Sequence, residues 1–93
     1  MKYDYTEKEK KKVIETFMLN NKITQVPAKE RKKYILLSEF VKRFEFGKEY
    51  TEREINESLI EVYPVGEYVE QRRYLITFEF FERTEDGSKY WLS

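Results

Sequence analysis

The sequence contains no cysteine and no histidine. Without cysteine it has no disulfides, thiolate metal ligands or cysteine nucleophile, and without histidine it lacks the commonest general base and metal ligand. Catalysis would need paired carboxylates, or a lysine or tyrosine with a perturbed pKa, and no spacing of the glutamates predicts a shared pocket. We therefore predict that the protein is not an enzyme and uses no cofactor and no metal ion.

Long apolar runs are also absent. No stretch of the sequence approaches the roughly 18 consecutive apolar residues that a membrane helix needs. The first residues lack the apolar segment that is typical of a signal peptide. These absences predict a cytoplasmic protein with no membrane partner.

Charged and aromatic side chains, in contrast, are abundant. Of the 93 residues, 39% are charged and 17% are aromatic. Large aromatic side chains can build a core in a short chain, and a chain of this length has room for one core. We predict one domain over residues 1–93, with an N-terminal helix and connector over residues 1–27 and a core over residues 28–93.

The net charge is zero, but the basic residues are concentrated in the first third of the chain. Residues 1–33 carry ten basic and five acidic side chains. The basic side chains form two clusters: Lys8, Lys10, Lys11 and Lys12, and then Lys29, Arg31, Lys32 and Lys33. Such clusters serve either as solvated helix faces or as contacts to a phosphate backbone, and both interpretations stay open here.

The first two helices are predicted before residue 45. Thr6 and Glu9 have the spacing of a capping box, which predicts a helix over residues 6–19 that ends at Asn20 and Asn21. Pro27 can start a second helix, expected from residue 28. Apolar residues at steps of three and four support this second helix: Tyr34, Leu37, Val41 and Phe44.

Two more helices and a hairpin complete the prediction. Thr51 and Glu54 form a second possible capping box, opening a helix through residue 62, and a break at Gly66 precedes a helix over residues 67–78. From residue 74 onward a strand interpretation competes with helix, because apolar residues also alternate there. Two runs that flank Asp86-Gly87 predict a terminal β-hairpin. The predicted fold is α+β: a winged helix-turn-helix with an extra N-terminal helix and a C-terminal β-hairpin wing.

Several fragments together resemble a known family over roughly residues 12 to 92. They are Lys22 to Lys29, Phe44 to Asn56, Arg72-Arg73 followed by Leu75, Glu82-Arg83, Gly87 and Tyr90-Trp91. Their order and spacing resemble a bacterial family catalogued as domain of unknown function 2087. The resemblance implies a winged-helix domain, found alone or behind a helix-turn-helix repressor domain, that is associated with transcriptional regulation and has no established biochemical activity. Family members tend to have Gly where this chain has Glu79, and an aliphatic residue where it has Gln71.

A winged helix usually reads DNA with the second helix of the turn pair and touches the backbone with its wing. Here the helix over residues 67–78 is expected to present Gln71, Arg73 and Thr77 on its open side, with Lys89 and Arg83 on the wing. Arginine and glutamine suit guanine and adenine edges. Two glutamates of the same helix, Glu67 and Glu70, oppose phosphate binding. The acidic final third of the chain opposes it as well.

Structural roles are the simpler interpretation for the two adjacent arginines. Arg72 is expected to pack on aromatic rings, with its head paired to Glu57 or Glu61. Arg73 is expected to form a surface pair with Glu70.

A second basic surface is predicted where the second helix begins. Its first-turn amides and positive dipole end attract anions, and four cationic side chains would add to this: Lys29, Arg31, Lys32 and Lys33. We hypothesise that phosphate groups dock at this helix start instead of along the fourth helix.

The sequence thus predicts a transcriptional-regulator type of winged-helix domain that binds DNA weakly or with a partner. The alternative is a module for protein interaction or dimerisation that binds no nucleic acid. For this alternative the partner would be a regulator protein or a second copy, with the first helix or the aromatic residues of the two ends as contact surfaces.

Overall fold

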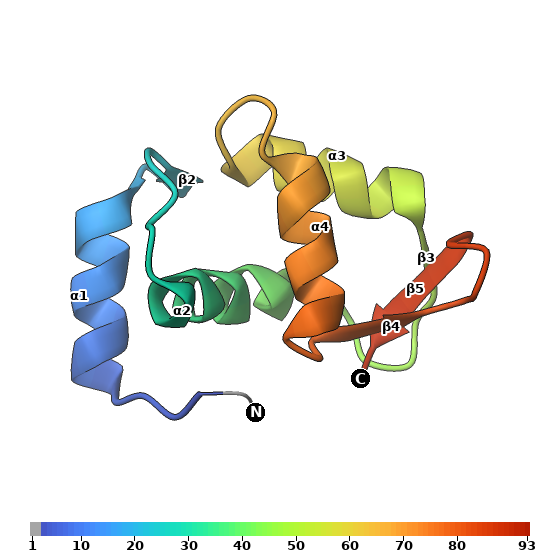
Figure 1. Ribbon diagram of the computed structural model, residues 1–93, viewed down its shortest axis with the longest axis horizontal. Coiled ribbons are helices and arrows are strands. Elements are labelled where there is room, and N and C mark those ends of the chain that lie inside the picture. The colour runs from blue at the N-terminus through green and yellow to red at the C-terminus, as the bar shows by residue number, and fades with distance from the viewer. Residues whose placement is uncertain (1–2) are drawn as a thin grey trace.

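A computed structural model describes residues 3–93 (Figure 1). The described residues form four α-helices and two small antiparallel sheets, which confirms the predicted α+β class. In chain order the elements are α1 (Glu7–Phe17), β1 (Met18–Leu19), β2 (Lys22–Ile23), α2 (Glu30–Phe40), the 3₁₀ turn η1 (Val41–Arg43), β3 (Tyr50–Thr51), α3 (Glu52–Val62), α4 (Tyr68–Thr77), β4 (Phe81–Arg83) and β5 (Lys89–Leu92). No helix within this part of the chain is long and apolar enough to cross a membrane.

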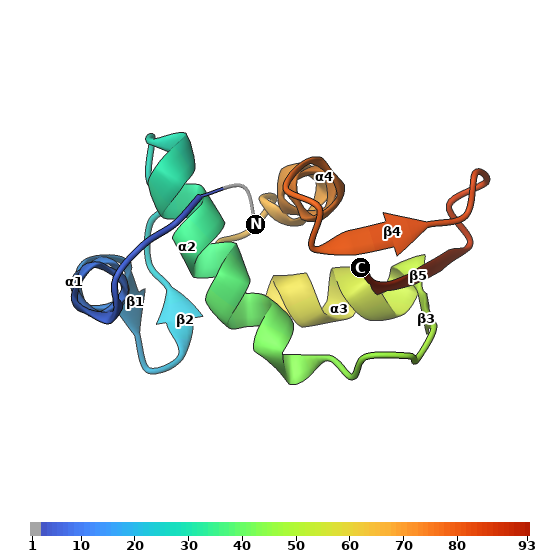
Figure 2. The same ribbon diagram turned by 90° about the horizontal axis from the view of Figure 1, so that it is seen from below.

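Helix α2 forms the centre of the core. Its residues Tyr34 to Leu37 are at most 1% exposed, and Phe40 is also buried. Because neighbouring residues on a helix point in different directions, four consecutive buried residues mean that other elements cover α2 on several sides. Figure 2 shows α1 at one end of the molecule and the hairpin β4–β5 at the other, with α2 and α4 between them.

The N-terminal segment differs from its prediction in two respects. The hydroxyl of Thr6 accepts the amide of Glu9 at 3.1 Å, but Glu9 does not complete a capping box, because its carboxylate binds Arg31 instead. Asn20 and Asn21 have φ angles of 52° and 64° and form the two-residue turn between β1 and β2. Left-handed asparagine pairs suit such hairpin turns, so the prediction of a helix up to residue 19 is wrong by two residues.

The predicted start of the second helix is also wrong. Helix α2 begins at Glu30, and Lys29 is its N-cap with an extended backbone at ψ 130°. The carbonyl of Lys29 accepts the amides of Lys32 and Lys33, both at 3.1 Å. Helical hydrogen bonding therefore starts from Lys29, and Pro27 lies before the helix rather than in its first turn.

The pair α3 and α4 follows the sequence signals closely. Thr51 and Glu54 form the predicted capping box: the Thr51 hydroxyl accepts the Glu54 amide at 3.1 Å, and the Glu54 carboxylate accepts the Thr51 amide at 2.9 Å. A turn at Gly66, which has a φ angle of 86°, leads into α4. Helix rather than strand extends to Thr77, as predicted.

The end of α4 places a non-glycine residue in a left-handed conformation. Glu79 has φ 65°, and the Phe80 amide reaches back to the Leu75 carbonyl at 3.0 Å. This is the Schellman type of helix end, where glycine is usual. The family resemblance had indicated glycine at this position.

We expect Glu79→Gly to raise the free energy of unfolding by up to about 1 kcal/mol, because glycine adopts positive φ without steric cost. Urea denaturation measures the change. Glu79→Ala is the matched control, since it removes the charge but keeps the β-carbon. Equal stability of the glycine and alanine variants would show that the backbone at this position is not strained.

A three-stranded sheet of order β3-β5-β4 covers the other end of the core. The predicted hairpin β4–β5 is confirmed, with Glu82 opposite Trp91. Its turn is held by Asp86, whose carboxylate accepts the Ser88 amide at 3.0 Å, and this bond with neighbouring hydroxyl bonds lowers the pKa of Asp86 to about 2. Strand β3 pairs with β5 through Tyr50 opposite Tyr90, a third strand that the sequence had not predicted.

Candidate functional site

The predicted basic surface at the start of α2 is divided among several structural contacts. Arg31 donates to the carboxylate of Glu9 at 2.6 and 2.8 Å and to the carbonyl of Asp4 at 2.6 Å. These bonds brace α1 against α2, and the hydrogen bond from Arg31 lowers the pKa of Glu9. Arg31 is therefore engaged within the protein rather than free for a phosphate.

The three lysines of this cluster point to different places. The Nζ of Lys33 lies 3.3 Å from the Tyr74 hydroxyl and 5.2 Å from the centre of its ring, which ties α2 to α4. The Nζ of Lys32 lies 5.6 Å from the centre of the Phe17 ring. Lys29 is exposed, and its side chain has no hydrogen-bond or ion-pair partner among the described residues. The four cations thus do not converge on one site.

Gln71 lies in the core, not on the open side of α4. Its side chain is only 1% exposed, and neither atom of its amide has a hydrogen-bond partner among residues 3–93. The expectation that Gln71 faces outward is therefore wrong. Helical spacing turns Gln71 inward, because it lies three residues after Tyr68 and four residues before the fully buried Leu75.

The predicted partners of the two arginines that follow are also wrong. Arg72 pairs with Glu52 at the start of α3, at 3.1 Å from Nε to Oε1, and not with Glu57 or Glu61. Arg73 does not pair with Glu70, whose carboxylate accepts the Tyr74 hydroxyl at 3.4 Å.

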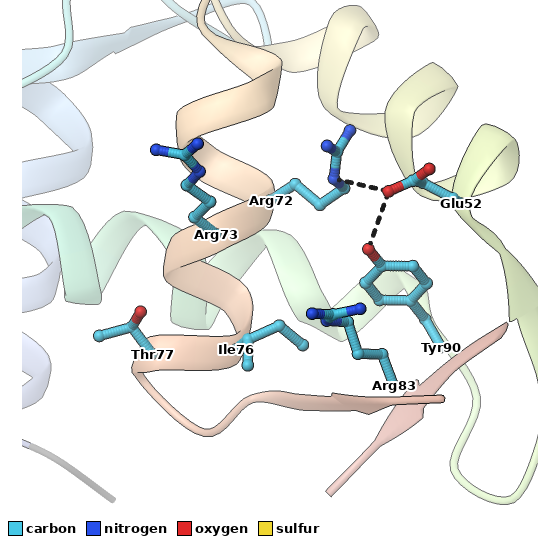
Figure 3. Close-up of a pocket in the computed structure, with 7 residues that line it drawn as sticks. All are labelled: Glu52, Arg72, Arg73, Ile76, Thr77, Arg83 and Tyr90. Atoms are coloured by element: carbon cyan, nitrogen blue, oxygen red, sulfur yellow. Dashed lines mark hydrogen bonds and ion pairs between the residues drawn. The ribbon is translucent and has the colours of Figure 1, made fainter. Parts of the chain in front are cut away.

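Helix α4, the start of α3 and the hairpin enclose a cleft of about 420 Å³ (Figure 3). The residues that line it are Glu52, Arg72, Arg73, Ile76, Thr77, Arg83 and Tyr90. Figure 3 shows Arg73 on the α4 side of the cleft, with Arg83 and Tyr90 on the side of the hairpin. The cleft thus brings Arg73 and Thr77, predicted on α4, together with Arg83 of the predicted wing.

An ion pair and two hydrogen bonds form one wall of the cleft. Oε1 of Glu52 forms an ion pair with Nε of Arg72 at 3.1 Å and accepts a hydrogen bond from the hydroxyl of Tyr90, also at 3.1 Å. Arg72 also donates from Nη1 to Oδ1 of Asn56 at 2.7 Å. Burial is the larger cause that raises the pKa of Tyr90, and the hydrogen bond to Glu52 is the second. The hydroxyl of Tyr90 therefore remains a proton donor at neutral pH. This wall joins α3, α4 and β5.

The charges of the cleft are only partly compensated. The sequence has six arginines, and four of them form ion pairs with glutamates: Arg31, Arg43, Arg53 and Arg72. The two without a carboxylate partner among the described residues, Arg73 and Arg83, both line this cleft. Within residues 3–93, Arg83 donates only to the carbonyls of Thr84 and Glu85, each at 3.3 Å. The arrangement can hold an anion, because guanidinium groups bind planar and tetrahedral oxyanions through paired hydrogen bonds.

Lys89, the remaining predicted residue, lies outside the lining of the cleft and pairs with Glu49 at 3.4 Å. Sequence reasoning did not assign Glu52 and Tyr90 to a site. Glu52 belongs to the first turn of α3, and Tyr90 belongs to the apolar register of β5. No local signal in the sequence joins these residues to Arg72, because the contacts span 20 and 38 residues of chain.

No curated protein and no solved structure matches the chain. One family profile does, described as uncharacterized protein conserved in bacteria (DUF2087), and it matches residues 22–92. The match includes α2, the pair α3 and α4, and the three-stranded sheet, and it leaves out α1. The chain belongs to this bacterial family of uncharacterised proteins, DUF2087.

Proposed function

We propose that this protein is a winged-helix domain that binds nucleic acid through α4 and the hairpin β4–β5. The elements α2, β3, α3, α4, β4 and β5 follow one another in the order of a winged helix, with β5 in the middle of the sheet. In this assignment α3 and α4 are the helix-turn-helix pair, α4 is the recognition helix and the hairpin is the wing.

The observation that carries the proposal is the position of the two arginines without carboxylate partners. Arg73 lies on the exposed side of α4, and Arg83 lies on the first strand of the wing. Both line the same cleft. An arginine that binds no glutamate is free to bind a phosphate oxygen or a guanine edge. Recognition helix and wing would therefore each contribute one free cation to the same ligand.

The charge of the domain limits the strength of this binding. The net charge is zero, and α4 carries Glu70 on its exposed surface. Because affinity for nucleic acid rises with the number of phosphates neutralised, we expect few phosphate contacts and weak binding without sequence preference. A partner protein or a specific site would then be needed for tight binding, in line with a regulatory role.

Fluorescence anisotropy with a random-sequence duplex at several salt concentrations tests this proposal. We expect weak binding, with a logarithmic salt slope of roughly −2 to −3, since each phosphate contact contributes about −0.9. Arg73→Ala should weaken binding by about fivefold and reduce the magnitude of the slope by about one.

Two further variants localise the binding. Arg53→Ala is the matched control, because Arg53 is 88% exposed, pairs with Glu57 and does not line the cleft. It should leave the slope unchanged.

The double variant Lys29→Ala, Lys32→Ala tests the alternative surface at the start of α2. Loss of binding in the double variant, with none in Arg73→Ala, would move the interface from the cleft to α2.

A second candidate function, a module for protein interaction, is favoured by a different observation. Three apolar side chains around the turn between α3 and α4 are exposed: Ile60 by 57%, Val65 by 105% and Val69 by 39%. Exposed apolar residues that lie near one another often mark protein contacts. Absence of any duplex binding in the anisotropy experiment would favour this candidate over the first.

A further inference from the structure

Among the described residues, Glu52 is the one carboxylate that lines the cleft between α3, α4 and the hairpin. It is 44% exposed at its side chain, whereas Arg72, which it holds, is 21% exposed. Figure 3 shows Arg72 directed across the cleft wall toward Glu52, with Tyr90 directed to the same carboxylate. Glu52 therefore occupies the position from which an incoming anion would reach Arg72, the third arginine of the lining.

The guanidinium of Arg72 has N–H groups that bind no partner among the described residues. Its Nε is bound to Glu52 and its Nη1 to Asn56, while Nη2 has no hydrogen-bond partner among residues 3–93. A guanidinium presents five N–H donors in a fixed fork, so it can bind a second oxyanion along its free edge. Such an anion would share Arg72 with Glu52, and the ion pair to Glu52 would weaken the bonds from the guanidinium to the anion.

We propose that the cleft binds a phosphate group and that Glu52 is a built-in competitor that weakens this binding through its hold on Arg72. This inference rests on the proposed function and specifies the ligand chemistry of the same site. Phosphate suits the cleft because Arg73 and Arg83 lack carboxylate partners and Thr77 adds a hydroxyl to the lining. Charge-assisted bonds from arginine to phosphate are among the strongest polar contacts in proteins.

Titration with inorganic phosphate, followed by NMR of the arginine side-chain N–H signals, tests the proposal without any nucleic acid. Glu52→Gln keeps the size of the side chain and removes its charge. We expect it to bind phosphate about fivefold more tightly than the natural chain. Glu57→Gln is the matched control, because Glu57 lies on the same helix but outside the cleft lining. The control should change the affinity by less than about twofold.

A double-mutant comparison separates competition for Arg72 from a general effect of charge. In an Arg72→Gln background, Glu52→Gln should give no gain, because the guanidinium for which Glu52 competes is gone. The same fivefold gain in both backgrounds would overturn the proposal, and so would unchanged or weaker phosphate binding by Glu52→Gln. If Glu52→Gln does not fold, Arg72→Gln alone decides: phosphate binding reduced at least about threefold supports the proposal, and binding as in the natural chain overturns it.

A duplex with 5′-hydroxyl ends, which offers only phosphodiesters, identifies the source of the phosphate group. Tighter duplex binding by Glu52→Gln assigns the cleft to the nucleic-acid backbone. A gain for inorganic phosphate with no duplex binding assigns it to a free phosphate or phosphorylated small molecule, and the proposed function then fails while this inference stands. Duplex binding that depends on Arg73 but does not respond to Glu52→Gln leaves the proposed function in place and overturns the inference.

Discussion

Tyr34→Ala is expected to lower the free energy of unfolding by about 3–5 kcal/mol, the range for removal of a large buried aromatic side chain. Tyr34 is fully buried, and four other rings surround it. Their centroids lie 4.8 to 6.3 Å from that of Tyr34: Tyr3, Tyr5, Phe78 and Phe80. The cavity would therefore open where the N-terminal segment, α2 and the end of α4 meet.

Chemical denaturation monitored by circular dichroism measures the loss of stability. Tyr34→Phe is the matched control, because it keeps the ring and its edge-to-face contacts, which contribute about 0.5–1.5 kcal/mol per pair. We expect the phenylalanine variant to lose much less stability than the alanine variant. A similar loss in both variants would mean that ring packing does not account for the stability at this position.

Gln71→Leu is expected to raise the free energy of unfolding by about 1–3 kcal/mol. The amide of Gln71 is 1% exposed, and both its Nε2 and its Oε1 lack partners among the described residues. A buried polar group without a hydrogen bond has lost its bonds to water and gained none, so its removal is stabilising. Leucine has a similar volume and requires no partner. The family resemblance had already indicated an aliphatic residue at this position.

Thermal and urea unfolding of Gln71→Leu test this expectation. Gln25→Leu is the matched control, because Gln25 is exposed and its replacement should change stability by less than about 0.5 kcal/mol. A loss of stability in Gln71→Leu would show that the amide has a hydrogen-bond partner in solution. Since Gln71 faces the core, neither variant should alter phosphate binding in the cleft, so stability and ligand binding can be measured separately.

The sequence predicted the local elements of this fold well where the signal and its structural effect lie within a few residues. The capping box of Thr51 and Glu54 is an example, because all its donors and acceptors lie within one turn of helix. The turn at Asp86 is another, since its carboxylate binds an amide two residues away. The chain also turns at Asn20 and Asn21, where the first helix was predicted to end, although their turn joins two strands.

Predictions failed where a side chain had to be assigned to one of several neighbours or faces. Helical spacing allowed Gln71 to be placed on the open side of α4, and only the packing of α4 on the core decides that it is buried. Arg72 was assigned to glutamates in the second half of α3, but the crossing of the two helices brings it to Glu52 in the first turn. Strand β3 has two residues, too few for a periodic pattern, and it exists because β5 pairs with it.

By itself, therefore, the sequence determined the order and type of the main elements and the membership of the basic clusters. Caps, turns and helical stripes depend on interactions between residues close in the chain, which short-range physical chemistry can predict. The tertiary structure alone decided which arginines remain without a carboxylate. Ion pairs such as that of Arg72 and Glu52 join residues on different helices, and their partners follow from the crossing of the helices, which the packing of the whole core sets.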